Sequence, residues 1–335
     1  MDPSNPSVRN EGLGMRCANT LATSAFLASA VSTHSLQQAL LATSHTLLTY
    51  TDRVRVETAW SSLSNAPAPE PVFQHIQKAW DAPIVSNLSG LVLASAVSEI
   101  DLARLKAASS PHSGDWLHAP PIASIGLLLS DEDIRLSVAQ RLGVKACSPY
   151  TCVCGKPVDA RGLHGLSCRR SMARHQRHSM VNDVIWRAVK RAKVPAHKEP
   201  TGLVLQNGKR PDGATLIPWS RGKALAWDVT VPDTYATSHI QSTSAEACSA
   251  AKHAARSKIS KYHELSTTHI FYPVSIETAG SWDAQAAELV EEIGRRSAME
   301  TDDPNETMYL FQRISVAIQK GNALSFTYTF DIGNT

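Results

Sequence analysis

The stretch Arg210–Asp233, RPDGATLIPWSRGKALAWDVTVPD, decides how the second half of this chain folds. From Leu225 to Val231, large apolar residues occupy every second position, which is the pattern of a β-strand with one buried face. Between Asp212 and Asp228 lie residue types that turn a chain, at Gly213, Pro218, Ser220, Arg221 and Gly222. The stretch therefore predicts a β-hairpin that brings Asp212 and Asp228 side by side at one end of a sheet.

Two carboxylates held a few ångströms apart repel each other, so such a pair is stabilised by protonation or by a divalent metal ion. A metal ion bound by two carboxylates, with coordination positions left open, can polarise a phosphodiester and activate a water molecule. The alternative is structural: Asp212 closes a turn and Asp228 caps a strand end, as in most Pro-Asp-Gly triplets. The hairpin alone leaves both interpretations open.

Charge is distributed unevenly along the 335 residues, although the formal net charge is only +3. The length predicts two or three domains with a buried core. Residues 141–200 carry 13 Lys or Arg against 3 Asp or Glu; residues 1–140 carry 8 against 12, and residues 201–335 carry 12 against 15. A basic segment just before an acid pair favours a polyanionic partner, and a solvated basic helix without a partner is the alternative.

Four of the six cysteines lie between Cys147 and Cys168. No apolar run is long enough to span a bilayer, and the N-terminal MDPSNPSVRNEG has no signal-peptide core, so we expect an intracellular protein without a membrane partner. Clustered cysteines in such a chain indicate a metal site before a disulfide. The expected zinc ligands are Cys152, Cys154, His164 and Cys168.

Glycines at positions 155, 162 and 165 supply the tight backbone that a small zinc knuckle needs. The single residue between Cys152 and Cys154 is a shorter spacing than is usual for zinc. Cys147, His175 and His178 therefore remain alternative ligands. Reduced, buried cysteines without a metal are the structural alternative.

Residues 1–120 have helical apolar spacing and predict a helical region, with a long helix from Ser86 to Ala108. Residues 121–146 follow as a linker and helix. Ser130, followed by Asp131, Glu132 and Asp133, is a good start for that helix. The chain has no aromatic-x-Asp-Asp tetrad of the kind found in a polymerase palm.

A long amphipathic helix is expected from about Arg169 to the residues before Pro195. Four of its arginines are candidates for contact with phosphate: Arg169, Arg170, Arg174 and Arg177. Gly202–Leu205 is expected to form a first strand, and Asn207-Gly208 to form a turn. The elements expected after the hairpin are a helix over Thr243–Tyr262, a strand over His269–Glu277, and helices over Trp282–Arg296 and Asp303–Lys320, the last opened by a capping box.

These elements predict an α+β protein with a helical N-terminal region, a small zinc knuckle over residues 147–170, and an α/β domain with a small mixed sheet over residues 171–335. The chain resembles a known module in the order of its parts. These parts are a Cys-Cys-His-Cys knuckle, a basic helix, Arg-Pro-Asp, a second aspartate sixteen residues later, and a helix ending in Lys-x-x-Lys-Tyr. That module is the C-terminal restriction-like endonuclease of R-two-type non-LTR retrotransposon reverse transcriptase proteins, a branch of the PD-(D/E)XK superfamily. The resemblance covers about residues 125–335, and residues 1–120 resemble the thumb-side helical remnant of such elements.

The resemblance implies that Asp212 and Asp228 bind Mg²⁺, and that the protein nicks DNA in the nucleus. The superfamily has a lysine two residues after the second acid, whereas this chain has Thr230. The positive charge of the superfamily's lysine would then come from Lys258 or Lys261 on the following helix. Each of these two lysines could equally be an exposed helix residue. Glu199 is a candidate third acid. Arg210 is a candidate for contact with phosphate or with a carboxylate.

Three functions follow as expectations. The first is a Mg²⁺-dependent DNA endonuclease, and the second is a zinc-containing module that binds DNA or RNA and has lost cleavage. The third is a helical scaffold whose α/β half only packs against a partner. Without polymerase motifs, the chain would be a fragment, a decayed copy or a repurposed piece of such an element.

Overall fold

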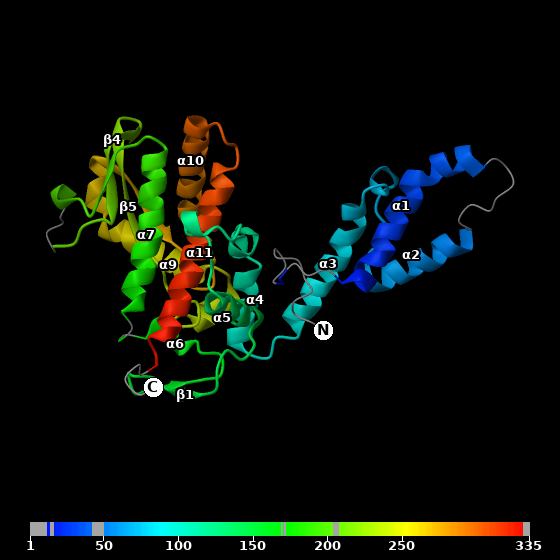
Figure 1. Cartoon of the computed structure of the whole chain (residues 1–335), viewed down its shortest axis with the longest axis horizontal. Coiled ribbons are helices and arrows are strands. Elements are labelled where there is room, and N and C mark those ends of the chain that lie inside the picture. The colour runs from blue at the N-terminus through cyan, green and yellow to red at the C-terminus, as the bar shows by residue number, and fades with distance from the viewer. Residues whose placement is uncertain are drawn as a thin grey trace. The chain divides into compact units, whose positions relative to one another are not determined.

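The computed structural model of the chain describes residues 12–13, 17–41, 50–168, 170, 172–203 and 208–330 (Figure 1). The protein is α+β, 59% helical, with a helical N-terminal region and a small mixed sheet, so the predicted fold class is confirmed. The chain forms two compact units, Met1–Ala96 and Val97–Thr335. The boundary lies well before residue 120, because the helix Glu99–Ala108 packs within the second unit.

The first unit contains helices α1 (Ala18–Leu41), α2 (Tyr50–Ser64) and α3 (Gln77–Ala94). Its core is built around two buried tryptophans, Trp60 and Trp80, whose rings meet edge to face at 5.0 Å. The indole N–H of Trp60 donates to the carbonyl of Trp80 at 2.9 Å. The long helix expected over Ser86–Ala108 is instead two helices, because the chain leaves α3 at Ser95 and Ser98 caps the next helix.

The second unit holds the remaining elements. Its helices are α4 (Glu99–Ala108), α5 (Asp131–Leu142), α6 (His164–Ser167), α7 (Ala173–Arg191), α8 (Ile240–Ala245), α9 (Ser249–Lys261), α10 (Ala284–Thr301) and α11 (Glu306–Thr327). Its strands are β1 (Tyr150–Thr151), β2 (Pro157–Val158), β3 (Ala196–Lys198), β4 (Gly213–Ser220), β5 (Lys223–Thr230) and β6 (His269–Ser275). Short 3₁₀ turns occur at η3 (Asp115–His118), η4 (Ala123–Ile125), η5 (Thr201–Leu203) and η6 (His263–Thr267). None of the helices in the described parts of the chain is long and apolar enough to cross a membrane.

The main sheet has the strand order β3-β4-β5-β6. β3, β4 and β5 pair antiparallel, whereas β5 and β6 pair parallel in a continuous register. The predicted hairpin is therefore present as β4 and β5. Its turn is formed by Arg221 (φ 49°) and Gly222 (φ 74°), and two successive positive φ angles match the twist that a tight hairpin needs.

The two faces of the hairpin pack differently. Leu225, Trp227 and Val229 contribute to a large core shared with α7, α10 and α11. Ala226 lies on the other face, in a smaller cluster with Tyr262 at the end of α9. Asp228 follows this alternation and points with Ala226 toward α9, because successive side chains of a strand point to opposite faces.

Several expected element boundaries differ from those observed. The helix expected over Thr243–Tyr262 is divided into α8 and α9, because Cys248 takes a left-handed conformation (φ 66°). The capping box before the last helix does not form: Asn305 makes no side-chain cap, and the carboxylate of Glu306 pairs with Arg191. The edge strand is Ala196–Lys198. Of the strand expected over Gly202–Leu205, the first two residues lie in a 3₁₀ turn, and residues 204–205 lie outside the described residues.

Candidate functional site

Asp212 lies at the start of the hairpin, immediately before β4, and its carboxylate is held by two elements. Oδ2 accepts a 2.6 Å hydrogen bond from the backbone N–H of Val229 and lies 2.9 Å from Nε2 of His178 on α7. The carbonyl oxygen of Asp212 accepts from the N–H of Glu199 at 2.9 Å. Among the described residues, none donates a hydrogen bond to Oδ1 of Asp212.

Asp228 is buried within β5, with 3% of its surface exposed. Its Oδ1 accepts from Nζ of Lys258 at 2.5 Å, and its Oδ2 lies 2.6 Å from the hydroxyl of Tyr262. Nζ of Lys261 lies 4.0 Å from the same oxygen. All three partners come from α9 and the residue that follows it, so this helix compensates the buried charge of Asp228.

Tyr262 connects the two acids through the backbone. Its hydroxyl lies 2.7 Å from the carbonyl oxygen of Arg210, two residues before Asp212. Burial and the neighbouring carboxylate of Asp228 raise the pKa of Tyr262, so the phenol stays protonated. Burial lowers the pKa of Lys261, whose Nζ lies 2.5 Å from the phenol oxygen.

Both aspartates line one open groove of about 650 Å³. The exposed and partly exposed basic residues of its lining are Arg170, Arg174, Lys209, Arg210, Lys258 and Lys261, together with His175 and His178. The two carboxylates are thus outnumbered by cations around them. A concave, basic surface of this kind attracts a polyanion such as a phosphodiester backbone.

His178 belongs to the site, although the sequence suggested it only as an alternative zinc ligand. Its hydrogen bond with Asp212 raises the pKa of His178, which favours the imidazolium beside the carboxylate. Asn182, one turn further along α7, bonds to the carbonyl of Asp212 at 3.3 Å and to the indole of Trp227 at 2.9 Å. The signal in the sequence was the polar pair at positions 178 and 182, which lie on one face of the helix.

Arg177 does not face the solvent, so the expectation that it contacts phosphate is wrong. Its surface is 2% exposed, and its guanidinium donates to Oδ1 of Asn322 at 3.0 Å and to the carbonyl of Leu166 at 3.1 Å. Burial lowers its pKa to about 10. The side chain joins α6, α7 and α11, which is a structural role.

The other expected phosphate contacts have different environments. Arg170 is exposed and donates to the carbonyl of Val153 in the knuckle at 3.1 Å, and Arg174 is exposed on α7. Arg210 forms an ion pair with Glu199. Arg169 lies outside the described residues.

Glu199 does not join the two aspartates, which corrects its expected place as a third acid. It follows the last residue of β3 with a left-handed φ of 46°, so the chain turns away from the strand at this point. Its side chain is 62% exposed and lines a different pocket, beside Lys198 and Leu216. Thr230, in contrast, lines the groove, and its buried hydroxyl has no hydrogen-bond partner among the described residues.

The knuckle brings Cys152, Cys154, His164 and Cys168 together, with their ligand atoms all within 4.8 Å of one another. The two sulfurs of Cys152 and Cys168 are 3.7 Å apart, and the sulfur of Cys154 is 3.2 Å from Nε2 of His164. Sulfurs bound to one tetrahedral zinc ion at about 2.3 Å are separated by about 3.8 Å. This set therefore fits a four-coordinate zinc ion.

The remaining candidate zinc ligands are engaged elsewhere. The thiol of Cys147 lies 3.4 Å from the carbonyl of Asp159, His175 is exposed on α7, and His178 bonds to Asp212. A hydrogen bond from the backbone of Lys156 lowers the pKa of Cys154 to about 6, which favours the thiolate form that binds metal. Among the described residues, the Cys-Cys-His-Cys set is the one whose ligand atoms converge.

Magnesium has a less complete ligand set in this structure. Among the described residues, the knuckle is the only group of three or more His, Cys, Asp or Glu side chains whose ligand atoms converge. Asp212 retains Oδ1 for a cation, whereas both oxygens of Asp228 are bonded to α9 and Tyr262. Carboxylate oxygens are ligands that Mg²⁺ prefers, and a divalent ion shared by the two acids would have to replace the ammonium of Lys258.

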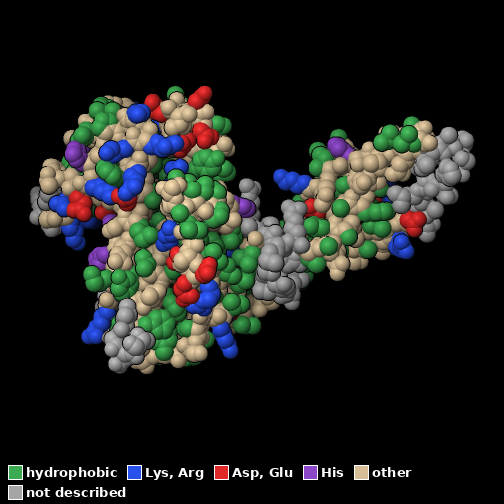
Figure 2. Space-filling model, viewed as in Figure 1, with side chains coloured by type: hydrophobic (Ala, Val, Ile, Leu, Met, Phe, Trp, Pro, Cys, Tyr) green, Lys and Arg blue, Asp and Glu red, His purple; other side chains and the backbone are tan. Residues whose placement is uncertain are grey.

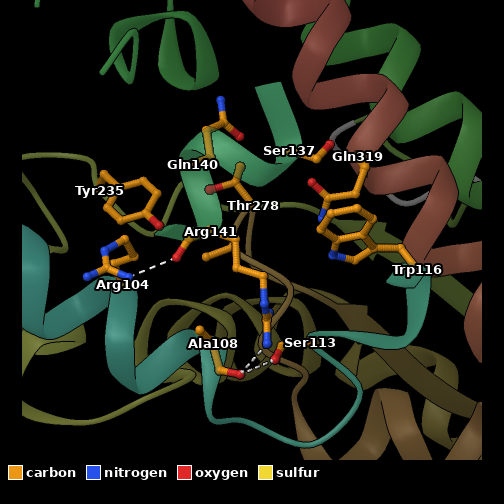
Figure 3. Close-up of a pocket in the computed structure, with 11 residues that line it drawn as sticks. Arg104, Ala108, Ser113, Trp116, Ser137, Gln140, Arg141, Tyr235, Thr278 and Gln319 are labelled. Atoms are coloured by element: carbon orange, nitrogen blue, oxygen red, sulfur yellow. Dashed lines mark hydrogen bonds between the residues drawn. The ribbon is translucent and has the colours of Figure 1, made fainter. Parts of the chain in front are cut away.

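A second, enclosed cavity of about 20 Å³ lies among α4, α5 and α11 (Figure 3). Arg104 donates to the carbonyl of Arg141 at 2.8 Å, and Arg141 donates to the carbonyl of Ala108 at 3.2 Å. The hydroxyl of Ser137 and the amide nitrogen of Gln140 have no hydrogen-bond partner among the described residues. The cavity has room for one or two water molecules that could satisfy these groups, and it is too small for a substrate.

No protein-family model matches this chain, and no curated protein matches it significantly.

Proposed function

We propose that the second unit is a Mg²⁺-dependent DNA endonuclease domain that nicks duplex DNA, similar to the restriction-like endonuclease of R-two-type retrotransposons. One observation carries this proposal: Asp212 and Asp228 lie at adjacent positions of one hairpin and line one basic groove, with Lys258 against the second acid. Two carboxylates and a lysine at a basic groove are the groups that phosphodiester hydrolysis needs. A DNA substrate implies action in the nucleus.

Each residue has a chemical role in this proposal. Oδ1 of Asp212 and one oxygen of Asp228 would hold Mg²⁺, which supplies a bound water as nucleophile and polarises the phosphate. Lys258, displaced from Asp228, donates to a non-bridging oxygen and stabilises the charge that develops in the transition state. His178 orients the carboxylate of Asp212 through its hydrogen bond.

The other basic residues position the substrate. Arg174 and Lys209 lie on the groove lining and can follow the phosphate backbone. The zinc knuckle would keep Arg170 at the entrance of the groove, because Arg170 bonds to the knuckle carbonyl of Val153. Zinc therefore has a structural role in the proposal and takes no part in the chemistry.

A plasmid-nicking assay tests the proposal. Supercoiled plasmid is incubated with the full chain, with and without Mg²⁺ and without a chelator, so that the knuckle keeps its metal. We expect nicking only with Mg²⁺, and a loss of at least a hundredfold in Asp212→Asn and in Asp228→Asn. The matched control is Asp183→Asn, an acid on α7 outside this groove.

Equal nicking by the wild type and both groove variants, at an unchanged unfolding temperature, rejects the endonuclease. The second candidate is a DNA- or RNA-binding module without cleavage, which is favoured by Thr230 in the lysine position and by the pairing of Asp228 with Lys258. It predicts binding that weakens with salt and survives both Asp→Asn changes. Binding that is absent even at low salt rejects this candidate and leaves the scaffold hypothesis.

A further inference from the structure

A second groove lies on the opposite face of α7 from the acid pair. His178 lines the first groove, whereas Met180, Val184 and Arg187, rotated by about half a turn around the helix, line the second. The second groove has a volume of about 840 Å³ and is bounded by α7, α11 and the loop that contains η4. It shares no lining residue with the groove of Asp212 and Asp228.

The floor of this groove is apolar. Leu127 and Ala188 are buried in it, and Met180, Val184 and Ala317 complete it. Next to the floor, the side chain of Ile125 is 49% exposed. Met180 and Val184 are partly exposed, so a partner that covers them and Ile125 gains free energy at about 25 cal/mol per Å² of apolar area.

The rim of the groove is basic. It carries Arg187, Arg191, Lys198, Arg313 and Lys320 against a single acid, Asp183. In Figure 2, α7 and α11 face the viewer, and Lys and Arg side chains lie beside hydrophobic ones over these two helices.

Part of the rim charge is compensated within the protein. Asp183 pairs with Arg187 and with Lys198, and Arg191 pairs with Glu306.

Arg313 differs from the other cations of the rim. It is half-buried at the groove, and no carboxylate among the described residues lies within ion-pair distance of its guanidinium. Burial lowers the pKa of this side chain, although a guanidinium remains charged at neutral pH. A half-buried cation without an ion-pair partner is stabilised when a carboxylate reaches it.

We propose that this groove docks an acidic, amphipathic α-helix of a partner protein, whose apolar face covers Met180 and Val184 and whose carboxylate pairs with Arg313. The combination of apolar floor and basic rim fits such a helix, with anchors at positions i, i+3, i+4 and i+7. Nucleic acid would leave the apolar floor uncovered, because its own outer surface is charged. The chemistry therefore favours a peptide over a second nucleic-acid path.

The test uses the full chain and a fluorescent 16-residue peptide with Leu at i, i+3, i+4 and i+7 and Glu at most other positions. We expect saturable binding by fluorescence anisotropy, weakened at least tenfold in Arg313→Glu and in Val184→Asp. The matched control is Arg295→Glu on α10, which reverses an exposed charge far from this groove in the sequence. If Val184→Asp lowers the unfolding temperature, Val184→Ser replaces it.

Two further probes separate the possible occupants. A scrambled peptide of the same composition, whose leucines do not share a helical face, should bind at least tenfold more weakly. The proposal is overturned if the wild type does not bind the first peptide, or if Arg313→Glu binds it equally well. It is also overturned if Arg313→Glu weakens binding of a 20-base-pair DNA duplex more than binding of the peptide, because the groove would then be a nucleic-acid site.

Discussion

Lys258 and Asp228 form the contact on which the proposed chemistry of the groove depends. The carboxylate is almost fully buried, and the ammonium of Lys258 stands where a divalent cation would be needed. The same side chain can therefore stabilise the metal-free fold and take part in the reaction, and these two roles can be separated by experiment.

Lys258→Gln is expected to lower the nicking rate about a hundredfold, because the transition state loses a charged donor. In the absence of Mg²⁺ it should also lower the free energy of unfolding by about 2 to 4 kcal/mol, because the charge of Asp228 stays buried without its cation. Added Mg²⁺ should then raise the unfolding temperature of Lys258→Gln more than that of the wild type. Lys252→Gln, which changes a lysine on the same helix, is the control. If Mg²⁺ raised the unfolding temperatures of Lys258→Gln and of the wild type equally, the result would argue against a metal ion at Asp228.

Glu277 makes a contribution of definite sign to the pH dependence of folding. It is fully buried, accepts hydrogen bonds from the N–H groups of Ala250 and Ala251 at the start of α9 and from the hydroxyl of Thr234, and burial raises its pKa. The folded state then binds more protons than the unfolded state between the usual glutamate pKa of about 4.3 and the raised value, so this residue makes stability fall as pH rises through that window.

Glu277→Gln should remove that fall and keep the hydrogen bonds from the N–H groups of Ala250 and Ala251 through its amide oxygen, so its cost at pH 7 should be small; its amide nitrogen would donate to the hydroxyl oxygen of Thr234 in place of accepting from it. Glu277→Ala leaves two buried N–H groups and the hydroxyl proton of Thr234 without acceptors and should cost about 2 to 4 kcal/mol. Urea unfolding at several pH values between 4 and 8 measures both effects. If the free energies of unfolding of the wild type and of Glu277→Gln changed in parallel with pH, Glu277 would not be the group that makes stability fall.

At the scale of elements, the hairpin positions the acid pair through one close contact. A Cβ added to Gly213 would lie 2.0 Å from the ring of Trp227, so only glycine allows β4 to begin next to Asp212. Trp227 is held in turn by Asn182 of α7. Packing therefore fixes the residue types at positions 213 and 227, next to the two acids.

Gly213→Ala should lower the free energy of unfolding by about 2 to 4 kcal/mol, because the indole must move within a packed core. Gly222→Ala places a side chain at φ 74° in the exposed turn, where nothing lies within 4 Å of the new Cβ, and should cost only about 1 to 2 kcal/mol. Denaturant unfolding compares the two variants. If Gly213→Ala were as stable as Gly222→Ala, the contact between the new Cβ and the ring of Trp227 would relax without a cost in free energy.

Local signals explain which elements could be predicted from the sequence. The hairpin and the start of α5 were correct, because period-two alternation and the capping box of Ser130 and Asp133 act within a few residues. The division between α8 and α9 was missed, because Cys248 is turned by its surroundings: it is buried, and its thiol bonds to the carbonyl of Trp282. No residue near Cys248 in the sequence carries that signal.

The candidate site shows the same limit. The structure brings the two predicted aspartates and Lys258 to one groove, whereas Arg177 is buried and Glu199 lines a different pocket. Counting charges along α7 cannot show which arginine faces Asn322 of α11, a residue 145 positions away. Likewise, no local pattern predicts that the chain turns out of the groove at Glu199, after the end of β3.

At the scale of the whole molecule, the zinc knuckle is packed against the end of the longest helix of the second unit. An added Cβ at Gly165 would lie 2.9 Å from the backbone of Phe326, the N–H of Val153 donates to the carbonyl of Thr329 at 3.2 Å, and Tyr150 stacks on Phe330 at 4.4 Å. The metal should therefore stabilise the end of α11 as well as the knuckle.

Removing zinc should raise amide hydrogen exchange in α6 and in the last turns of α11, and leave α1–α3 of the first unit unchanged. The double change Cys152→Ser with Cys168→Ser should reproduce the effect, with one zinc per chain lost by metal analysis. Cys147→Ser is the matched control, because Cys147 lies outside the ligand set. Retention of zinc in the double variant would identify different ligands.

The parallel pairing of β5 with β6 has a consequence for the order in which the chain folds. The β4–β5 ribbon joins neighbours in sequence and can close within microseconds, whereas β6 reaches β5 only after the crossover through α8 and α9 has formed. During this interval the two aspartates are already adjacent, but Lys258 and Tyr262 have not yet arrived. Early intermediates should therefore carry an uncompensated pair of negative charges, and divalent cations should accelerate refolding even where they add little to the final stability.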